Sequence, residues 1–427
     1  MRFIRGIIVS MLFCLSYAEM AANAQIKCDS EFLFDQRFRY EQKNNFDFNK
    51  SLKDEGGLFY LRTRIGFTTL LKNSEDREII RILAEGLDAR SWGYQLKAPA
   101  SQQDPFDLFQ GYLSMNDILG SGIGLKVGRQ AMSYGQNRLI SAPTWSNKVR
   151  SFDAGVIGYK NEKFKIDLFY GQVVNYYNEK FNRSSDDEQL FGFYGNVDMS
   201  DVHASIDGYF LVYKDWRTMT HKTRYTTGFL LSGSAIYDIQ YELELPFQFG
   251  DEGNVDIWAY ALHAGLSRKW DNVYCKPKMY VAYNQASGDH DSADSKNNTF
   301  LPLYGTVHAP YGLMDLFRWQ NMREIELGTV LSLNKQLKVT PQWNFFWLDD
   351  VHDYCYNSSG AKVRSRLPSS DGCSFVGQEV SLRVKYTFNK HLDVETGYAH
   401  FFTGNYVRDT GPADDADWFY VQVLLKY

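Results

Sequence analysis

Arginines that alternate with apolar residues along predicted β-strands are the side chains of this sequence best suited to bind a ligand. Arg62 and Arg64 alternate with Leu61 and Ile65, so the arginines share one face of a strand and the apolar side chains share the other. A guanidinium group keeps a permanent positive charge, and its planar donors can pair with a carboxylate through two parallel hydrogen bonds. Several arginines spaced along a path would each bind an acidic ligand weakly. The ligand could then pass from one arginine to the next without being trapped.

The same alternation turns many cations toward the inner face of the predicted strands: Arg37, Arg39, Arg62, Arg64, Arg81, Lys126, Lys165, Arg224, Lys278, Lys338, Arg383 and Lys385. The first three strands supply a concentrated part of this set. We therefore expect Arg62, Arg64 and Arg81 to belong to a ligand-binding surface. The alternative for each of them is a structural ion pair inside the wall.

Acidic residues turn inward by the same rule, namely Asp35, Glu85, Asp167, Asp238, Glu242, Glu244, Glu324, Glu326, Glu379 and Glu395. The interior is therefore of mixed charge. Acids of the segment 237–249 lie many strands away from Arg62 and Arg64, so we expect a cationic wall to face an anionic wall. Such a transverse field would also suit a general porin.

Four segments show most clearly the strands that must position these side chains: 59–69, 237–249, 337–348 and 379–388. In each, one face is apolar and the other is polar or charged. An unpaired charge is very costly in a packed core, whereas it is tolerated in a wet lumen. The pattern therefore favours a wall with lipid on one side and water on the other.

The whole pattern predicts an all-β fold, a transmembrane antiparallel β-barrel of about 18 strands. Tight turns at 161–162, 233–234, 334–335 and 389–390 alternate with long connections such as 288–321 and 349–373. We expect short periplasmic turns and long extracellular loops. The segment 417–427 alternates up to a terminal aromatic, Tyr427, and is expected to be the closing strand.

The amino terminus predicts export to the cell envelope. Arg2 and Arg5 precede an apolar run, and Ala22-Asn23-Ala24 is a small-residue cleavage signal. We therefore predict a signal peptide at residues 1–24, cleaved near Ala24, and a single outer-membrane barrel domain at residues 25–427. The 29 Tyr, 30 Phe and 9 Trp residues suit the aromatic girdles of a barrel in a Gram-negative outer membrane. The formal net charge of −5 identifies no partner, and no nucleic-acid partner is expected.

Cysteines and histidines are the residues of this sequence that could form disulfides or bind a metal ion. Cys355 and Cys373 lie in one predicted outer loop, so a disulfide between them is predicted; Cys28 and Cys275 both fall near the other rim, and their pairing stays open. The 8 histidines show no metal-ligand spacing. Acids at 289, 291 and 294 lack the glycine and closing glutamate of a calcium loop, which favours a solvated loop. No metal and no cofactor are expected.

Several ordered stretches carry a resemblance to a known family. The stretch Gly128-Arg129-Gln130 to Leu139 is followed by 145–147, 150–153, 242–250, 287–289, 311–317, 319–321, 346–348 and 400–406. Together they resemble the alginate-export outer-membrane porin family over nearly the whole mature chain. The resemblance implies an 18-stranded barrel with an arginine-rich constriction that passes a linear polyuronate by facilitated diffusion, without catalysis. It adds Arg129 and Arg138 to the expected pore residues, and places Arg150 in the same signature.

The expected partners are an anionic polysaccharide or oligosaccharide, outer-membrane lipid, the barrel-assembly machinery and periplasmic export partners. Three alternatives stay open. The first is a general or uptake porin for acidic oligosaccharides or small anions, because a passive pore has no intrinsic direction. The second is a barrel enzyme that uses His263 on a lipid-facing wall. The third is a plugged or adhesive barrel, in which the aromatic segment 304–319 is either a lid or an adhesin.

Overall fold

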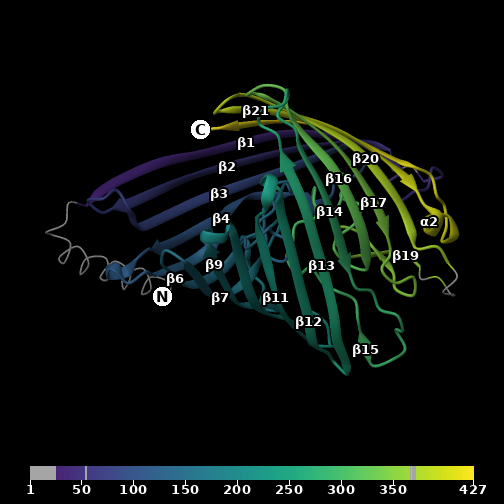
Figure 1. The fold of residues 1–427 in the computed structure, drawn as a ribbon, viewed down its shortest axis with the longest axis horizontal. Helices are drawn as coiled ribbons and strands as arrows, with labels where there is room; N and C mark the ends of the chain where they lie inside the picture. Colours follow the sequence, from purple (N-terminus) through teal and green to yellow (C-terminus); the bar gives the residue numbers. More distant parts are fainter. Residues whose placement is uncertain (1–25, 53–54, 366, 368–371) are drawn as a thin grey trace.

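A closed antiparallel β-barrel is the architecture of this chain in the computed structural model, which describes residues 26–52, 55–365, 367 and 372–427 (Figure 1). The expected signal peptide at 1–24 lies outside these residues. The barrel has 18 strands: β1 (Lys27–Asn44), β2 (Gly56–Lys72), β3 (Glu78–Tyr94), β4 (Asp104–Met115), β5 (Ile123–Gln130), β6 (Phe152–Lys160), β7 (Phe164–Asn175), β9 (Glu188–Met199), β10 (Ala204–Asp215), β11 (Lys222–Ser234), β12 (Gln240–Glu252), β13 (Val255–Lys269), β14 (Lys278–Ala286), β16 (Met322–Ser332), β17 (Leu337–Trp347), β20 (Phe375–Asn389), β21 (Leu392–Thr403) and β22 (Ala416–Lys426).

The barrel closes between its first and last strands. β22 pairs antiparallel with β1, from Asp35 opposite Lys426 to Asn44 opposite Asp417. The alternation of the last strand is as expected: Trp418 and Tyr420 are buried on the inside, whereas Phe419 and Tyr427 are exposed. Closure removes the unpaired edges that an open sheet would present to lipid.

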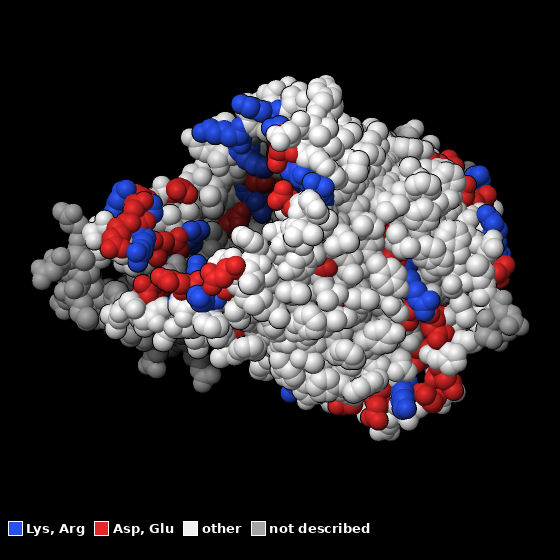
Figure 2. Space-filling model, viewed as in Figure 1, with Lys and Arg blue, Asp and Glu red and all other residues white. Residues whose placement is uncertain are grey.

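The two faces of the wall differ as the period-two pattern predicts. On β2, Phe59 and Phe67 are 48% and 63% exposed, whereas Tyr60 and Arg62 are 5% and 3% exposed. Figure 2 shows a broad outer band almost without charged side chains, with Lys, Arg, Asp and Glu gathered toward the two ends. One boundary was wrong: β12 begins at Gln240, because residues 236–238 form a 3-10 turn that leaves Asp238 outside the wall.

Short and long connections separate onto the two rims. The turn rim carries 73–77, 116–122, 161–163, 200–203, 235–239, 270–277, 333–336 and 390–391. Among the described residues, the loop rim carries 45–52, 55, 95–103, 131–151, 176–187, 216–221, 253–254, 287–321, 348–365, 367, 372–374 and 404–415. The predicted alternation is confirmed, except that the connection at 253–254 is a tight turn on the loop rim. The carboxyl terminus lies at the turn rim.

The apolar core of this protein lies inside the barrel, where long loops fold into the lumen. Ile140, Phe300, Tyr311 and Trp319 all come from loops and are at most 1% exposed. The aromatic segment 304–319, expected to be either a lid or an adhesin, therefore packs inside the barrel.

The loops also carry short elements: β8 (Arg183–Ser184), β15 (Lys296–Asn297), β18 (Cys355–Tyr356), β19 (Lys362–Arg364) and α2 (Asn405–Asp409). No helix in the described part of the chain combines the length and the apolar character needed to cross a membrane.

The predicted disulfide between Cys355 and Cys373 is not formed: both are free thiols. Cys355 is buried on β18, where it lies opposite Arg364 of β19, whereas Cys373 is exposed just before β20. Two cysteines in one loop need not point toward each other, because the loop's own hairpin sets their directions. Cys28 and Cys275 are also free, and lie at the turn rim as expected.

Candidate pore constriction

The loop 131–151 crosses the lumen and is held on one side by arginines of β1 and β2. Arg37 Nη1 donates to the carbonyls of Thr144 and Trp145 at 2.8 and 2.9 Å. Arg62 Nη1 donates to the Thr144 carbonyl at 2.7 Å, and Arg39 Nη1 to that of Trp145 at 2.8 Å. Charged hydrogen bonds of this kind are stronger than neutral ones. The cationic wall therefore binds the carbonyl oxygens of the chain's own loop.

The same loop reaches the opposite, acidic wall through Arg138. Its guanidinium group pairs with Glu244 at 2.8 Å and, through Nη2, with Glu242, both on β12. Burial alone would lower the pKa of Arg138, but the charges of Glu244 and Glu242 outweigh that effect and raise it. The loop thus spans the lumen from a basic wall to an acidic wall, with charges that match each wall.

A second long loop, 287–321, joins the first inside the lumen. Ile140 and Tyr304 form a parallel bridge, in which the Tyr304 amide donates to Leu139 at 2.9 Å and the Ser141 amide donates to Tyr304 at 3.1 Å. Arg150 Nη1 donates to the same Tyr304 carbonyl and, at 3.2 Å, to the Ser141 carbonyl. The two loops therefore form one partition across the barrel.

Glu379 of β20 holds the second loop by its amides. Its carboxylate accepts hydrogen bonds from the amides of Leu313 at 2.5 Å and Met314 at 3.3 Å. Gly312 has φ of +83°, and a Cβ atom there would meet Glu379 Oε2 at 2.6 Å, so only glycine fits this approach. Lumen-facing acids, like lumen-facing arginines, are used here to position loops.

Arg62 and Arg64 lie together, as predicted, and share an acidic partner. Arg62 Nη2 lies 3.2 Å and Arg64 Nε 3.6 Å from Asp35 Oδ1, and Arg64 Nε lies 3.4 Å from Glu85. Arg62 is buried, whereas the Arg64 side chain is 23% exposed. Of the two, Arg64 retains more access to the lumen.

The other expected residues lie apart from this pair. Arg81 pairs with Glu78 at 3.0 Å and lines a cavity of about 400 Å³ on the turn-rim side. Arg129 binds both carboxylate oxygens of Asp153, at 2.8 and 3.0 Å. Including Arg138, all five expected pore arginines therefore have a carboxylate partner, and their role in the pore stays a prediction.

Several other arginines form no ion pair with a carboxylate of the described residues, and three of them lie together at one cavity: Arg150, Arg224 and Arg318. They line a cavity of about 530 Å³ on the loop-rim side, where Arg224 donates to Gln248 at 2.7 Å and to the Thr299 carbonyl at 3.0 Å. The buried Nε of Arg318 has no hydrogen-bond partner among the described residues. Burial, together with the charge of Arg150, lowers the pKa of Arg318 to about 10, so it stays charged at neutral pH.

The partition separates these cavities from others on the turn-rim side. A cavity of about 800 Å³ also borders Arg150 on the loop-rim side and is lined by Trp145 and His308. A cavity of about 950 Å³ on the other side is lined by Gln136 and Glu242. Arg150 lines both loop-rim cavities. We call these two cavities together the vestibule, and Arg150 lies between them.

Arg318 was missed by the sequence analysis, although its surroundings offered a signal. It stands in Leu316-Phe317-Arg318-Trp319, where Phe317 and Trp319 are buried. An arginine between two buried aromatic residues is drawn toward the interior of the fold, where a cation needs a partner. Period-two analysis could not find it, because loops have no such period.

The enzyme alternative loses its only candidate residue. His263 is buried, with Nδ1 2.7 Å from Asn284 Oδ1 and Nε2 3.2 Å from Glu242. It borders the turn-rim cavity of 950 Å³. It is therefore not presented on the lipid-facing wall, where a barrel lipase would need it.

A closed barrel with an apolar outer band and a polar, loop-filled lumen defines the outer-membrane porins as a class. Within that class, the chain belongs to the Alginate export family, whose model matches residues 29–421, so the predicted family is confirmed. The family and fold are those of a transport protein.

Solved structures with the same fold include two from Pseudomonas aeruginosa. OccK3 (OpdO) is 13% identical, with a TM-score of 0.60 over 93% of this chain and 96% of that one. OccK2 (OpdF), solved in complex with glucuronate, is 10% identical, with a TM-score of 0.59 over 93% and 98%. At these identities the likeness concerns the fold alone. A comparison with curated proteins found no match in sequence.

Proposed function

We propose that this protein is an outer-membrane channel through which an anionic polysaccharide of the alginate-like polyuronate class passes by facilitated diffusion. The observation that carries the proposal is the set of Arg150, Arg224 and Arg318, which form no ion pair with a carboxylate of the described residues. The acids that share their cavity, Glu188, Asp215 and Glu252, pair instead with Arg217 and Lys222. The three arginines line a loop-rim cavity large enough for sugar units. The proposal includes no catalysis and no cofactor.

Uronate chemistry fits this cavity. Each sugar of a polyuronate carries one carboxylate, which an arginine binds through its planar donors. A bound anion would give the Nε of Arg318 a hydrogen-bond acceptor, which it lacks among the described residues. The anion would also reduce the repulsion between the positive charges of Arg150 and Arg318. The Alginate export family and the glucuronate bound to OccK2 (OpdF) support an acidic sugar as the ligand.

The five arginines expected from the sequence keep a place in this proposal as a second group. Arg64 and Arg81 are partly exposed and would add positive charge on the way to the vestibule. Their carboxylate partners reduce the field that a passing anion meets. We therefore assign Arg318 the larger effect on selectivity.

The test is ion selectivity and polyuronate block of the purified full chain in planar bilayers. We expect the wild-type channel to prefer anions and Arg318→Gln to reduce that preference severalfold, since one charge in a wet lumen contributes on the order of 1 kcal/mol. Arg318→Lys should restore most of it. Block by an alginate oligomer should weaken as salt is raised, because screening shortens the reach of the charges.

Arg323→Gln is the matched control, since that arginine lies at the loop rim but pairs with Asp349 at 2.8 Å. It should leave selectivity unchanged. The triple variant Arg62→Gln, Arg64→Gln and Arg81→Gln measures how much the arginines expected from the sequence contribute to anion selectivity. A cation-preferring wild-type channel would contradict the polyuronate proposal.

The alternative is a general or uptake porin for acidic oligosaccharides or small anions, which the mixed charge of the lumen also favours. Chain length separates the two. A polyuronate channel should be blocked more strongly by long oligomers than by uronate monomers, whereas a small-anion porin should respond to both alike. Delivery by periplasmic export partners and folding by the barrel-assembly machinery are parts of the same proposal.

A further inference from the structure

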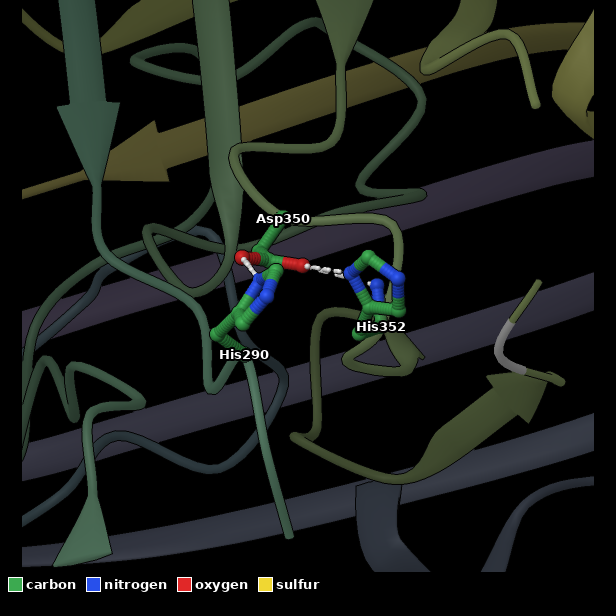
Figure 3. Close-up of side chains that lie close together, drawn as sticks. All are labelled: His290, Asp350 and His352. Atoms are coloured by element: carbon green, nitrogen blue, oxygen red, sulfur yellow. Dashed lines mark hydrogen bonds and ion pairs between the residues drawn. The ribbon is translucent and has the colours of Figure 1, made fainter. Parts of the chain in front are cut away.

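We propose that His290, Asp350 and His352 form a binding site for a divalent transition-metal ion of the zinc type, which ties the two longest loops together at the loop rim (Figure 3). His290 belongs to the loop 287–321, and Asp350 and His352 belong to the loop 348–374. This proposal does not depend on which solute the channel passes.

The three side chains already converge on one another. His290 Nδ1 lies 2.9 Å from Asp350 Oδ2, and His352 Nδ1 lies 3.0 Å from Asp350 Oδ1. Figure 3 shows both imidazole rings beside the single carboxylate, and their centroids are 4.4 Å apart. One ligand atom from each residue lies within 4.8 Å of the others. Among the described residues, no other group of three or more such side chains is as close.

That spacing is near what zinc needs. Ligand atoms about 2.1 Å from a tetrahedral zinc ion lie roughly 3.4 Å from one another, so small side-chain rotations would place an ion between them. Two imidazoles and one carboxylate are a ligand set that zinc accepts, with water in the remaining position. The ion would replace the hydrogen bonds between each Nδ1 and Asp350, and a neutral imidazole bound through Nδ1 would carry its proton on Nε2.

The backbone around the site is held in place independently of any ion. The Asp350 amide donates to Asn321 Oδ1 at 2.8 Å, and Asn321 Nδ2 donates to the Asp350 carbonyl at 3.0 Å. The Asp289 amide donates to Asp353 Oδ2 at 3.1 Å. These contacts fix both loops beside the cluster, so the ligands would not have to be collected from a mobile chain.

Access and local charge also suit a cation. The His290 side chain is 74% exposed, and those of His352 and Asp350 are 25% and 21% exposed. Asp291 and Asp289 add negative charge close to His290. An ion from the medium could therefore reach the site without opening the fold.

The test is a calorimetric titration of the detergent-solubilised full chain with zinc chloride. We expect one zinc ion per chain, with affinity lowered at least about tenfold by His290→Gln and likewise by His352→Gln. His221→Gln is the matched control, because His221 is an exposed histidine of the loop rim outside this cluster, and it should change nothing. His290 is the better first variant because its exposed side chain can be replaced without disturbing packing.

A second readout is the current through single channels. Zinc should reduce the fluctuations of the wild-type current, since it ties the two loops together, and should have no such effect on His290→Gln. No zinc binding by the wild-type chain would overturn the proposal and leave a hydrogen-bonded cluster. Equal weakening by His221→Gln, or zinc binding that survives both cluster variants unchanged, would overturn it as well.

Discussion

Arg39 holds Trp145 in two ways at once: its Nη1 donates to the Trp145 carbonyl at 2.8 Å, and its guanidinium carbon lies 3.9 Å from the centre of the indole ring. Trp145 also stacks on His308, at 3.8 Å between ring centroids. One tryptophan thus connects β1, the loop 131–151 and the loop 287–321. This junction is one of the contacts that hold the partition, beside those of Arg37, Arg62 and Arg138.

Trp145→Ala should loosen the partition and enlarge the pore. The variant loses the cation–π contact, which contributes about 0.5–2 kcal/mol, and the stacking on His308. We expect a higher and noisier single-channel conductance. Trp258→Ala is the control, because Trp258 is 62% exposed on the outer face and should leave conductance unchanged. An unaltered conductance in Trp145→Ala would mean that the loop is held by other contacts.

Arg138→Gln should destabilise the folded barrel more than it changes selectivity. The substitution removes the arginine partner of Glu242 and Glu244, which keep only their contacts with His263 and Tyr209. Breaking a buried ion pair costs about 3–5 kcal/mol. The free energy of unfolding, measured with a denaturant in lipid vesicles, should fall by an amount in that range. Arg323→Gln, at a half-exposed pair, should cost about 1 kcal/mol or less. A second change, Glu244→Gln, should restore part of the loss in Arg138→Gln.

The loop rim should face the outside of the cell. Ser292→Cys and Ser359→Cys, both at exposed positions of the loop rim, should react with an impermeant maleimide on intact cells. Ser358 is only half-buried where Ser359 is exposed, so a cysteine at position 358 should react more slowly. Glu162→Cys, on the turn rim, should react only after the outer membrane is opened. The reverse pattern would invert the orientation.

Cys355 and Cys373 should differ in reactivity as free thiols. Burial raises the pKa of Cys355 to about 12, so almost none of it is thiolate at pH 8, whereas Cys373 is exposed. Maleimide labelling of the folded protein should modify Cys373 and spare Cys355 until the barrel is unfolded. If neither thiol reacts before reduction, the disulfide expected from the sequence exists after all.

The wall of the barrel was predictable because its pattern is local. Side chains alternate along any strand, so Arg62 against Phe59 or Glu379 against Val380 could be assigned to a face without knowing the neighbouring strands. The boundary at Gln240 was missed, since an exposed turn can continue the alternation by chance.

The contacts within the lumen were not predictable, because they join residues far apart in the chain. Nothing near Arg138 in the sequence indicates Glu244, and nothing near His290 indicates His352. Similarly, the inward direction of Arg37 was expected, but its role in holding the loop carbonyls was not.

By itself, the sequence determined the barrel, the direction of its wall residues, the separation of turns and loops, and the family. Each of these follows from short-range alternation or from ordered motifs along the chain. Only the tertiary structure decided which charges are neutralised. It pairs Arg62, Arg64, Arg81, Arg129 and Arg138 with acids, while Arg150, Arg224 and Arg318 form no ion pair with a described carboxylate. The reason is physical: a charge acts through the groups within a few ångströms of it, and folding the loops into the lumen chooses those groups.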